Sequence, residues 1–97
     1  MIDVPNLNNR VSIITPIYNS EEFIVDTIES VISQSYKNWE LIIIDDCSTD
    51  NSLQLIQKHI DLDERISLFI NKENSGAAVS RNLGLKKSSG KFICFID

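Results

Sequence analysis

Short apolar runs alternate with amphipathic stretches along this chain. The runs are rich in β-branched and aromatic residues and predict strands at residues 11–15, about 39–44, 66–70 and 91–96. Between them, apolar residues recur at helical spacing, which predicts helices over about 20–34, 50–59 and 77–87. This order predicts an α/β domain of three layers, α-β-α, in which helices cover both faces of a mainly parallel sheet of four strands.

The second predicted strand carries the strongest functional signal. Its apolar run, Leu41 to Ile44, is typical of a strand buried on both faces, and it ends in two carboxylates, Asp45 and Asp46. The polar turn CSTDN follows at once. Open parallel sheets bind their ligands at the carboxyl ends of the strands. The pattern therefore predicts a binding site at this edge of the sheet.

Turn and cap residues set the expected boundaries. Pro16 should end the first strand, because proline cannot donate a hydrogen bond to a central sheet ladder. Asn19, with Glu22 three residues later, should cap the first helix, and Ser48 or Thr49 the second.

The third helix is expected to end at Gly90 and to pack through an apolar stripe. The stripe consists of Val79, Leu83 and Leu85. Three further side chains are expected in the core: Trp39, Phe92 and Cys94.

Composition narrows the class of protein. The 97 residues, 42% of them hydrophobic and 24% charged, fit one globular domain. The net charge of −5 argues against nucleic acid as a partner. The two cysteines form no metal-spaced pair, so reduced thiols are expected. Because no apolar run could span a bilayer and no signal peptide is recognisable, we expect an intracellular protein.

The turn after the first strand excludes several nucleotide-binding folds. It reads TPIYN and contains no glycine, whereas dinucleotide-binding folds and P-loops both require a glycine-rich loop there. A receiver domain of the flavodoxin-like order would carry its acid pair after the first strand, and here the acids follow the second.

Tyr18 in that turn is an aromatic ring at the expected ligand edge. Such a ring can stack on a planar base, and a nearby carboxylate can accept a hydrogen bond from a base N–H or a ribose hydroxyl. In a purely structural interpretation, Tyr18 anchors the start of a helix and Asp46 caps one. Spacing alone leaves both interpretations open.

Four motifs together resemble the nucleotide-binding half of the family 2 glycosyltransferases, which have the GT-A fold. They are VSIITPIYN, ELIIIDDCSTDNS, NSGAAVSRNLGL and GKFICFID, and they span residues 11–97 in the order and spacing of the family. The resemblance implies the strand order 3-2-1-4. It also implies an incomplete glycosyltransferase domain over residues 11–97. Residues 1–10 are polar, with a proline and three asparagines, and predict a flexible lead-in.

The resemblance also implies a nucleotide site. In the family, residues matching Pro16 and Tyr18 line the base pocket, and the second acid of the pair, here Asp46, contacts uracil. Asp45 would fix the loop and stays among the nucleotide candidates. The remaining candidates are Asn19 in the Tyr18 turn, Asn74 and Gly76 in the loop before the third helix, and Arg81 on that helix. Arg81 could instead be a surface salt-bridge residue.

Asp97 matches the first acid of the family's D-x-D motif, which coordinates Mg²⁺ or Mn²⁺ on the sugar diphosphate. The later acids, the general base and the acceptor-binding region would follow Asp97, so we expect a truncated domain that is inactive alone.

Cys47 replaces a glycine common in the family. A side chain there predicts a backbone without positive φ.

The resemblance implies an inverting glycosyltransferase that uses a nucleotide-sugar, with UDP-sugars favoured, and a sugar or lipid-linked acceptor. The full protein would act in polysaccharide or glycolipid synthesis, in the cytoplasm or peripherally at the inner face of the membrane.

A non-catalytic nucleotide-binding or assembly module on the same fold is the alternative, and further aspartates after Asp97 would favour the enzyme. A nucleotidyltransferase is disfavoured because its glycine-rich, basic loop is missing. The exposed edge of the fourth strand predicts self-association.

Overall fold

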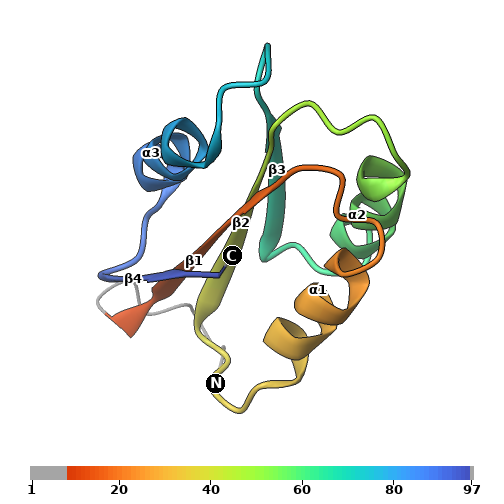
Figure 1. Cartoon of the computed structure of the whole chain (residues 1–97). Helices are drawn as coiled ribbons and strands as arrows, with labels where there is room; N and C mark the ends of the chain where they lie inside the picture. The colour runs from red at the N-terminus through yellow and green to blue at the C-terminus, as the bar shows by residue number, and fades with distance from the viewer. Residues whose placement is uncertain (1–8, 97) are drawn as a thin grey trace.

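A computed structural model describes residues 9–96 of the chain; residues 1–8 of the predicted lead-in and Asp97 lie outside the described part. Strands and helices alternate without exception (Figure 1). In chain order the elements are β1 (Val11–Ile17), α1 (Ile24–Ser33), β2 (Trp39–Asp45), α2 (Ser52–Ile60), β3 (Ile66–Ile70), α3 (Ala77–Lys87) and β4 (Phe92–Phe95). Within this part of the chain no helix is long and apolar enough to cross a membrane.

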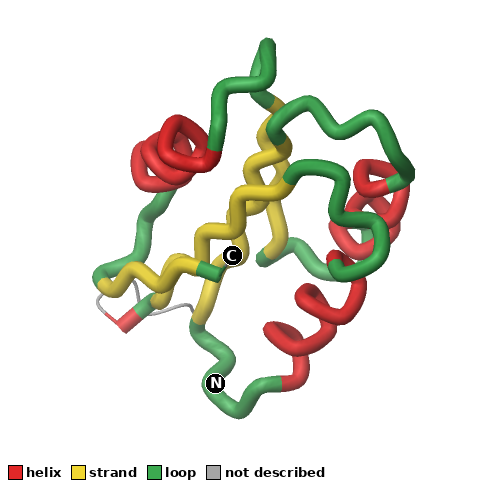
Figure 2. The backbone as a smooth tube through the Cα atoms, in the orientation of Figure 1, coloured by secondary structure: helices red, strands yellow, loops and turns green. Residues whose placement is uncertain are grey.

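The sheet confirms the predicted fold class and strand order. Its strands run β3-β2-β1-β4, and every neighbouring pair is parallel. Helices α1 and α2 lie on one face and α3 on the other, which gives the three layers (Figures 1 and 2). The carboxyl ends of β1, β2 and β3 therefore meet at one edge, where the loops into α1, α2 and α3 begin.

The core is divided unequally between the two faces. The larger cluster lies under α1 and α2, and it includes Ile28, Leu41, Ile43 and Ile56, with Trp39 at its end. Trp39 is only 2% exposed, which confirms that it packs in the core. The smaller cluster, under α3, consists of Ile14, Ile42 and Ile44 with Phe69 and Leu83 beside it.

Helix α3 packs through small residues, and the predicted apolar stripe is confirmed at Leu83 but wrong at Val79 and Leu85. Ser80 and Gly84 are its buried positions, whereas Val79 is 50% exposed and Leu85 41% exposed. A Cβ on Gly84 would lie 2.4 Å from Cγ2 of the buried Ile14, so the helix approaches β1 more closely than any larger residue allows. The helix ends at Lys87 as predicted, but the residue that follows its last turn as the cap is Ser88 and not Gly90.

The connection from α3 to β4 is held by the carboxylate of Glu40. Its Oε2 accepts hydrogen bonds from the hydroxyl of Ser12 at 2.5 Å, and from the backbone N–H and hydroxyl of Ser89 at 2.7 and 2.9 Å. Burial opposes ionisation of Glu40, but these hydrogen bonds, aided by the charge of Arg10, outweigh it and lower the pKa below the ordinary 4.5. Glu40 therefore ties β4 to the sheet from two strands away.

Pro16 lies inside β1, paired with Ile44, contrary to the prediction that it ends the strand. The carbonyl of Ile14 accepts a hydrogen bond from Ile96 on the β4 side, and residues two apart on a strand direct their polar groups to the same side. The nitrogen of Pro16 thus faces the β4 side beyond the last pair, Ile14 with Phe95. No ladder bond is lost there.

Both predicted helix caps are wrong. Helix α1 begins after Phe23 and α2 after Asn51, and neither residue makes a side-chain cap hydrogen bond. The side chains of Asn19 and Ser48 bond between the two loops instead, as set out below.

Strand β4 is shorter and more exposed than predicted. All four of its residues are exposed, with Phe92 at 51%, so the expectation that Phe92 and Cys94 lie in the core is wrong. The physical reason is its position at the sheet edge, where no described helix covers it.

We expect Gly84→Ala to lower the free energy of unfolding by about 1–2 kcal/mol, because the cost of overpacking against Ile14 exceeds the gain in helix propensity. Urea unfolding measures this. Asn82→Ala, at an exposed position of the same helix, is the control and should be neutral or slightly stabilising. Unchanged or higher stability of Gly84→Ala would show that α3 does not depend on this close approach.

Candidate functional site

A small cavity opens at the carboxyl edge of the sheet. It has a volume of about 110 Å³, and its lining residues are Pro16, Ile17, Tyr18, Asp46, Ala77 and Ser80. The ring of Tyr18 is 52% exposed at its rim. Three predicted site residues from two strand ends, Pro16, Tyr18 and Asp46, are thus brought to one place beside the start of α3.

The carboxylate of Asp46 is the centre of this edge. Its Oδ1 accepts hydrogen bonds from the Asn71 side chain at 2.9 Å and from the Ser75 backbone N–H at 2.7 Å, and its Oδ2 accepts one from the Gly76 N–H at 2.9 Å. The backbone carbonyl of Asp46 accepts a fourth bond, from the Asn74 side chain at 3.2 Å. Asp46 therefore holds the whole loop between β3 and α3.

These contacts also set the charge of Asp46. The hydrogen bond from Asn71 is the largest influence on its pKa and lowers it, followed by the bond from the Ser75 N–H. Burial opposes these two bonds less strongly, and the Gly76 N–H lowers the pKa further. The pKa lies below the ordinary 3.8, so the group is an anion at neutral pH. An anion that faces the cavity is an acceptor for N–H donors of a ligand.

Asp45 has a different role because successive side chains of a strand point to opposite faces. It is fully buried on the side of α1 and α2, and its Oδ2 accepts the Ser48 N–H at 3.0 Å. Its backbone carbonyl accepts the Asn71 N–H at 2.9 Å. Oδ1 has no hydrogen-bond partner. These contacts agree with a loop-fixing role and keep Asp45 out of the cavity lined by Tyr18.

Cys47 adopts φ 68°, which contradicts the prediction that a side chain here avoids positive φ. The turn out of β2 requires this conformation, and the loop compensates for its cost of roughly 1–2 kcal/mol. Its thiol donates a hydrogen bond to the carbonyl of Asn71 at 3.1 Å. Burial, together with the negative charges of Asp46 and Asp45, raises the pKa of the thiol, so Cys47 is not an activated nucleophile.

The other nucleotide candidates are not among the residues that line this cavity. The side chain of Asn74 and the backbone N–H of Gly76 both donate hydrogen bonds to Asp46. Gly76 has φ 91°, which only glycine adopts without strain. Arg81 is partly buried on α3, four residues after Ala77 and hence on the same face of the helix as that cavity residue. Asn19 is bonded to the loop after β2, where its Oδ1 accepts the N–H of Thr49 at 2.7 Å.

Two further residues of this edge, Asn71 and Ser80, are not among those predicted from the sequence. The side-chain amide of Asn71 donates to both Asp46 and the hydroxyl of Ser80, each at 2.9 Å, and Ser80 is fully buried. The position of Asn71 directly after β3, at the same sheet edge as Asp46, was the available signal. Ser80 gave none, because a serine inside a helix is usually a surface residue.

The described residues do not form a metal site. No group of three or more histidine, cysteine or acidic side chains gathers anywhere in residues 9–96. Asp97, the predicted metal ligand, lies outside this part. The residues present thus do not fit a divalent cation by themselves.

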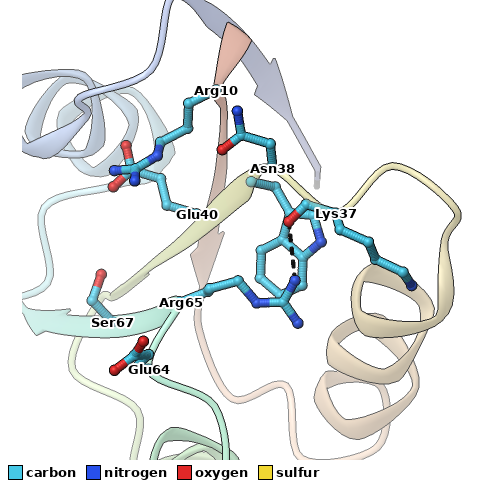
Figure 3. A pocket seen from close by; sticks show the side chains of 8 residues that line it. Arg10, Lys37, Asn38, Glu40, Glu64, Arg65 and Ser67 are labelled. Carbon is cyan, nitrogen blue, oxygen red and sulfur yellow. Dashed lines mark hydrogen bonds between the residues drawn. The ribbon is translucent and has the colours of Figure 1, made fainter. Parts of the chain in front are cut away.

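A larger cavity, of about 340 Å³, lies at the opposite, amino edge of the sheet (Figure 3). Cations and acids both line it, and its central cation is already paired. The central carbon of the Arg65 guanidinium lies 3.8 Å from the centre of the Trp39 ring. The same guanidinium forms a salt bridge to the carboxylate of Asp63 at 2.7 Å and donates a hydrogen bond to the carbonyl of Lys37 at 3.1 Å. We therefore place the functional site at the carboxyl edge despite its smaller volume.

Comparison with known proteins matches the chain to one family. The model of the family described as "Glycosyl transferase family 2" matches residues 12–97. The chain is 48% identical over 92 residues to TuaG of Bacillus subtilis (strain 168), which carries the name of a teichuronic acid biosynthesis glycosyltransferase. It is 47% identical over 87 residues to WfgD of Escherichia coli, named as a UDP-Glc:alpha-D-GlcNAc-diphosphoundecaprenol beta-1,3-glucosyltransferase.

These alignments include 95% and 90% of this chain but only 36% of TuaG and 34% of WfgD, so the chain spans about a third of either relative. Among solved structures, residues 1–349 of TarS from S. aureus, in complex with UDP, superpose with a TM-score of 0.84 at 34% sequence identity. The match covers 91% of this chain and 27% of that one.

We expect Asp46→Asn to loosen the loop before α3. The amide has one acceptor oxygen in place of two and would set its own N–H donors against those of the loop. Hydrogen exchange at the amides of Ser75 and Gly76 should become faster. The amide of Leu41, which donates to the carbonyl of Arg65 near the amino end of β2, should keep its protection and serves as the control. Unchanged exchange at Ser75 and Gly76 would contradict the assigned role of Asp46.

Proposed function

This chain belongs to glycosyl transferase family 2, and from that premise we propose that it binds the nucleotide of a sugar donor. The observation that carries the proposal is the cavity that Pro16, Tyr18 and Asp46 share at the carboxyl edge of the sheet. It offers an aromatic face, an ionised acceptor and the start of a helix within one small volume.

The two central side chains have distinct tasks in this proposal. The ring of Tyr18 stacks on the base, and the carboxylate of Asp46 accepts a hydrogen bond from a base N–H. A carboxylate has about four acceptor positions. Asn71, Ser75 and Gly76 occupy three of those on Asp46, which leaves one for the ligand.

We propose a UDP-sugar as the donor. The TarS structure that shares this fold at 34% identity contains UDP, and the name of WfgD specifies UDP-Glc as its donor. The remaining candidates, Asn74, Gly76 and Arg81, lie on the side of the cavity formed by α3 and its loop. A partly buried guanidinium there suits the anionic part of such a donor.

The whole protein, in this proposal, transfers the sugar with inversion to an acceptor hydroxyl during polysaccharide or glycolipid synthesis. We propose that the acceptor is a sugar or a lipid-linked sugar, since the name of WfgD specifies a GlcNAc-diphosphoundecaprenol acceptor. The whole enzyme would then act in the cytoplasm or peripherally at the inner face of the membrane. We expect Mg²⁺ or Mn²⁺ to be bound by Asp97 together with acids outside these 97 residues. The general base is also expected outside these 97 residues. The chain by itself should therefore bind nucleotide without catalysing transfer.

We expect Tyr18→Ala to raise the Kd for UDP about 5- to 150-fold, since stacking on an aromatic ring contributes roughly 1–3 kcal/mol per base. Tyr18→Phe, which keeps the ring, should bind like the parent chain. Isothermal titration calorimetry with UDP measures both. Tyr36→Ala removes another exposed tyrosine, one turned away from this edge and bonded to the carbonyl of Asn9, and serves as the control. Failure of the parent chain to bind UDP at millimolar concentration would refute the proposed function.

The 97-residue chain alone should self-associate through β4. Its exposed residues carry no charge, and one edge of the strand has no partner within the described sheet. Ile93→Lys should reduce association, since a lysine on an edge strand opposes pairing with another chain. Ile70→Lys, on the exposed end of the opposite edge strand, is the matched control. Light scattering at high concentration measures both, and a monomeric parent chain would contradict the prediction.

A further inference from the structure

The loops after β1 and β2 satisfy each other's backbone N–H groups. The N–H groups of Asn19, Ser20 and Glu21 donate to the side chains of Ser48, Ser52 and Asp50, at 2.8, 2.9 and 3.1 Å. In the other direction, the N–H groups of Thr49 and Asp50 donate to Asn19 and that of Asn51 donates to Glu21. Three N–H groups ahead of each helix therefore find their acceptors in the other loop or, for Ser52, in the first residue of the helix after it.

Asn19 is the residue on which this exchange converges. Its Oδ1 accepts the N–H groups of Thr49 at 2.7 Å and Asp50 at 3.3 Å, while its own N–H donates to Ser48 at 2.8 Å. Its backbone has φ 48°, a left-handed conformation that asparagine tolerates better than most residues. Few other side chains combine this backbone preference with an acceptor of the right length.

Tyr18 is fixed by this arrangement, although its own ring is half exposed. The residue before it, Ile17, accepts the N–H of Asp46 at 2.9 Å through its carbonyl, and the residue after it is Asn19. Both backbone neighbours of Tyr18 are thus tied to the loop that carries the acid pair. The backbone of Tyr18 is therefore held to that loop on both sides.

We propose that Asn19 is a positioning residue that holds the Tyr18 ring beside Asp46, and that it does not itself contact the nucleotide. The proposal rests on the proposed function. Its Oδ1 is directed into the loop after β2, and Asn19 is not among the residues that line the cavity. The effect of Asn19 on binding must then pass through Tyr18.

A double-mutant cycle tests this proposal. Asn19→Gly keeps the left-handed backbone and removes the acceptor, whereas Asn19→Asp keeps both. In the otherwise unchanged chain, Asn19→Gly should raise the Kd for UDP about tenfold and Asn19→Asp should change it less than about threefold. In a Tyr18→Ala background, Asn19→Gly should cause no further loss. An equal loss in both backgrounds would indicate direct contact and overturn the proposal.

A measurement without ligand separates this proposal from the proposed function. In NMR spectra of the free chain, Asn19→Gly should weaken the NOEs between the Tyr18 ring and Ala77 across the cavity, and the resonances of Tyr36 should not move. Unaltered Tyr18 NOEs would overturn the positioning role even if UDP binds, and altered NOEs would support it even if UDP does not. Ser48→Ala removes only the acceptor of the Asn19 N–H and should give the same pattern more weakly, which covers the case that Asn19→Gly does not fold.

Discussion

The carboxylate of Asp46 is the interaction on which the functional edge depends. It stands at the end of β2, faces α3 because of strand alternation, and binds the loop between β3 and α3 through Asn71, Ser75 and Gly76. The loop fixes where α3 begins. From there α3 descends so close to β1 that only Gly84 fits against Ile14. One anion thus sets the placement of the only helix that covers this face within the described residues.

The fold could be predicted from sequence where the pattern was local and periodic. Strand β3 and helix α3 begin and end where predicted, and the order of strands follows the family resemblance. The errors occur where a distant contact decides the outcome. Pro16 remains in β1 because of where β4 stops, α3 packs through Ser80 and Gly84 because of its distance from Ile14, and Phe92 is exposed because β4 is an edge.

In the site, too, local patterns could be predicted from the sequence and distant contacts could not. The sequence located Pro16, Tyr18 and Asp46 correctly at one edge, because strand ends can be read from apolar runs. It could not identify what Asp46 binds, since two of the donors are backbone N–H groups, which any residue supplies. Local spacing likewise predicts Asn19 as the cap of its own helix, although its acceptor serves a loop about thirty residues away.

A single acid that both orders a loop and faces a ligand couples the two tasks. If the free acceptor position of Asp46 takes a base N–H, the ligand adds a bond to a carboxylate already bound by Asn71, Ser75 and Gly76. Hydrogen bonds to one ionised group share its charge, so each new donor changes the strength of the others. The net charge of −5 offers no general attraction for an anionic donor, and recognition must therefore come from such local geometry. The order of the loop before α3 and the affinity for nucleotide are then linked quantities, and a change in either alters the other.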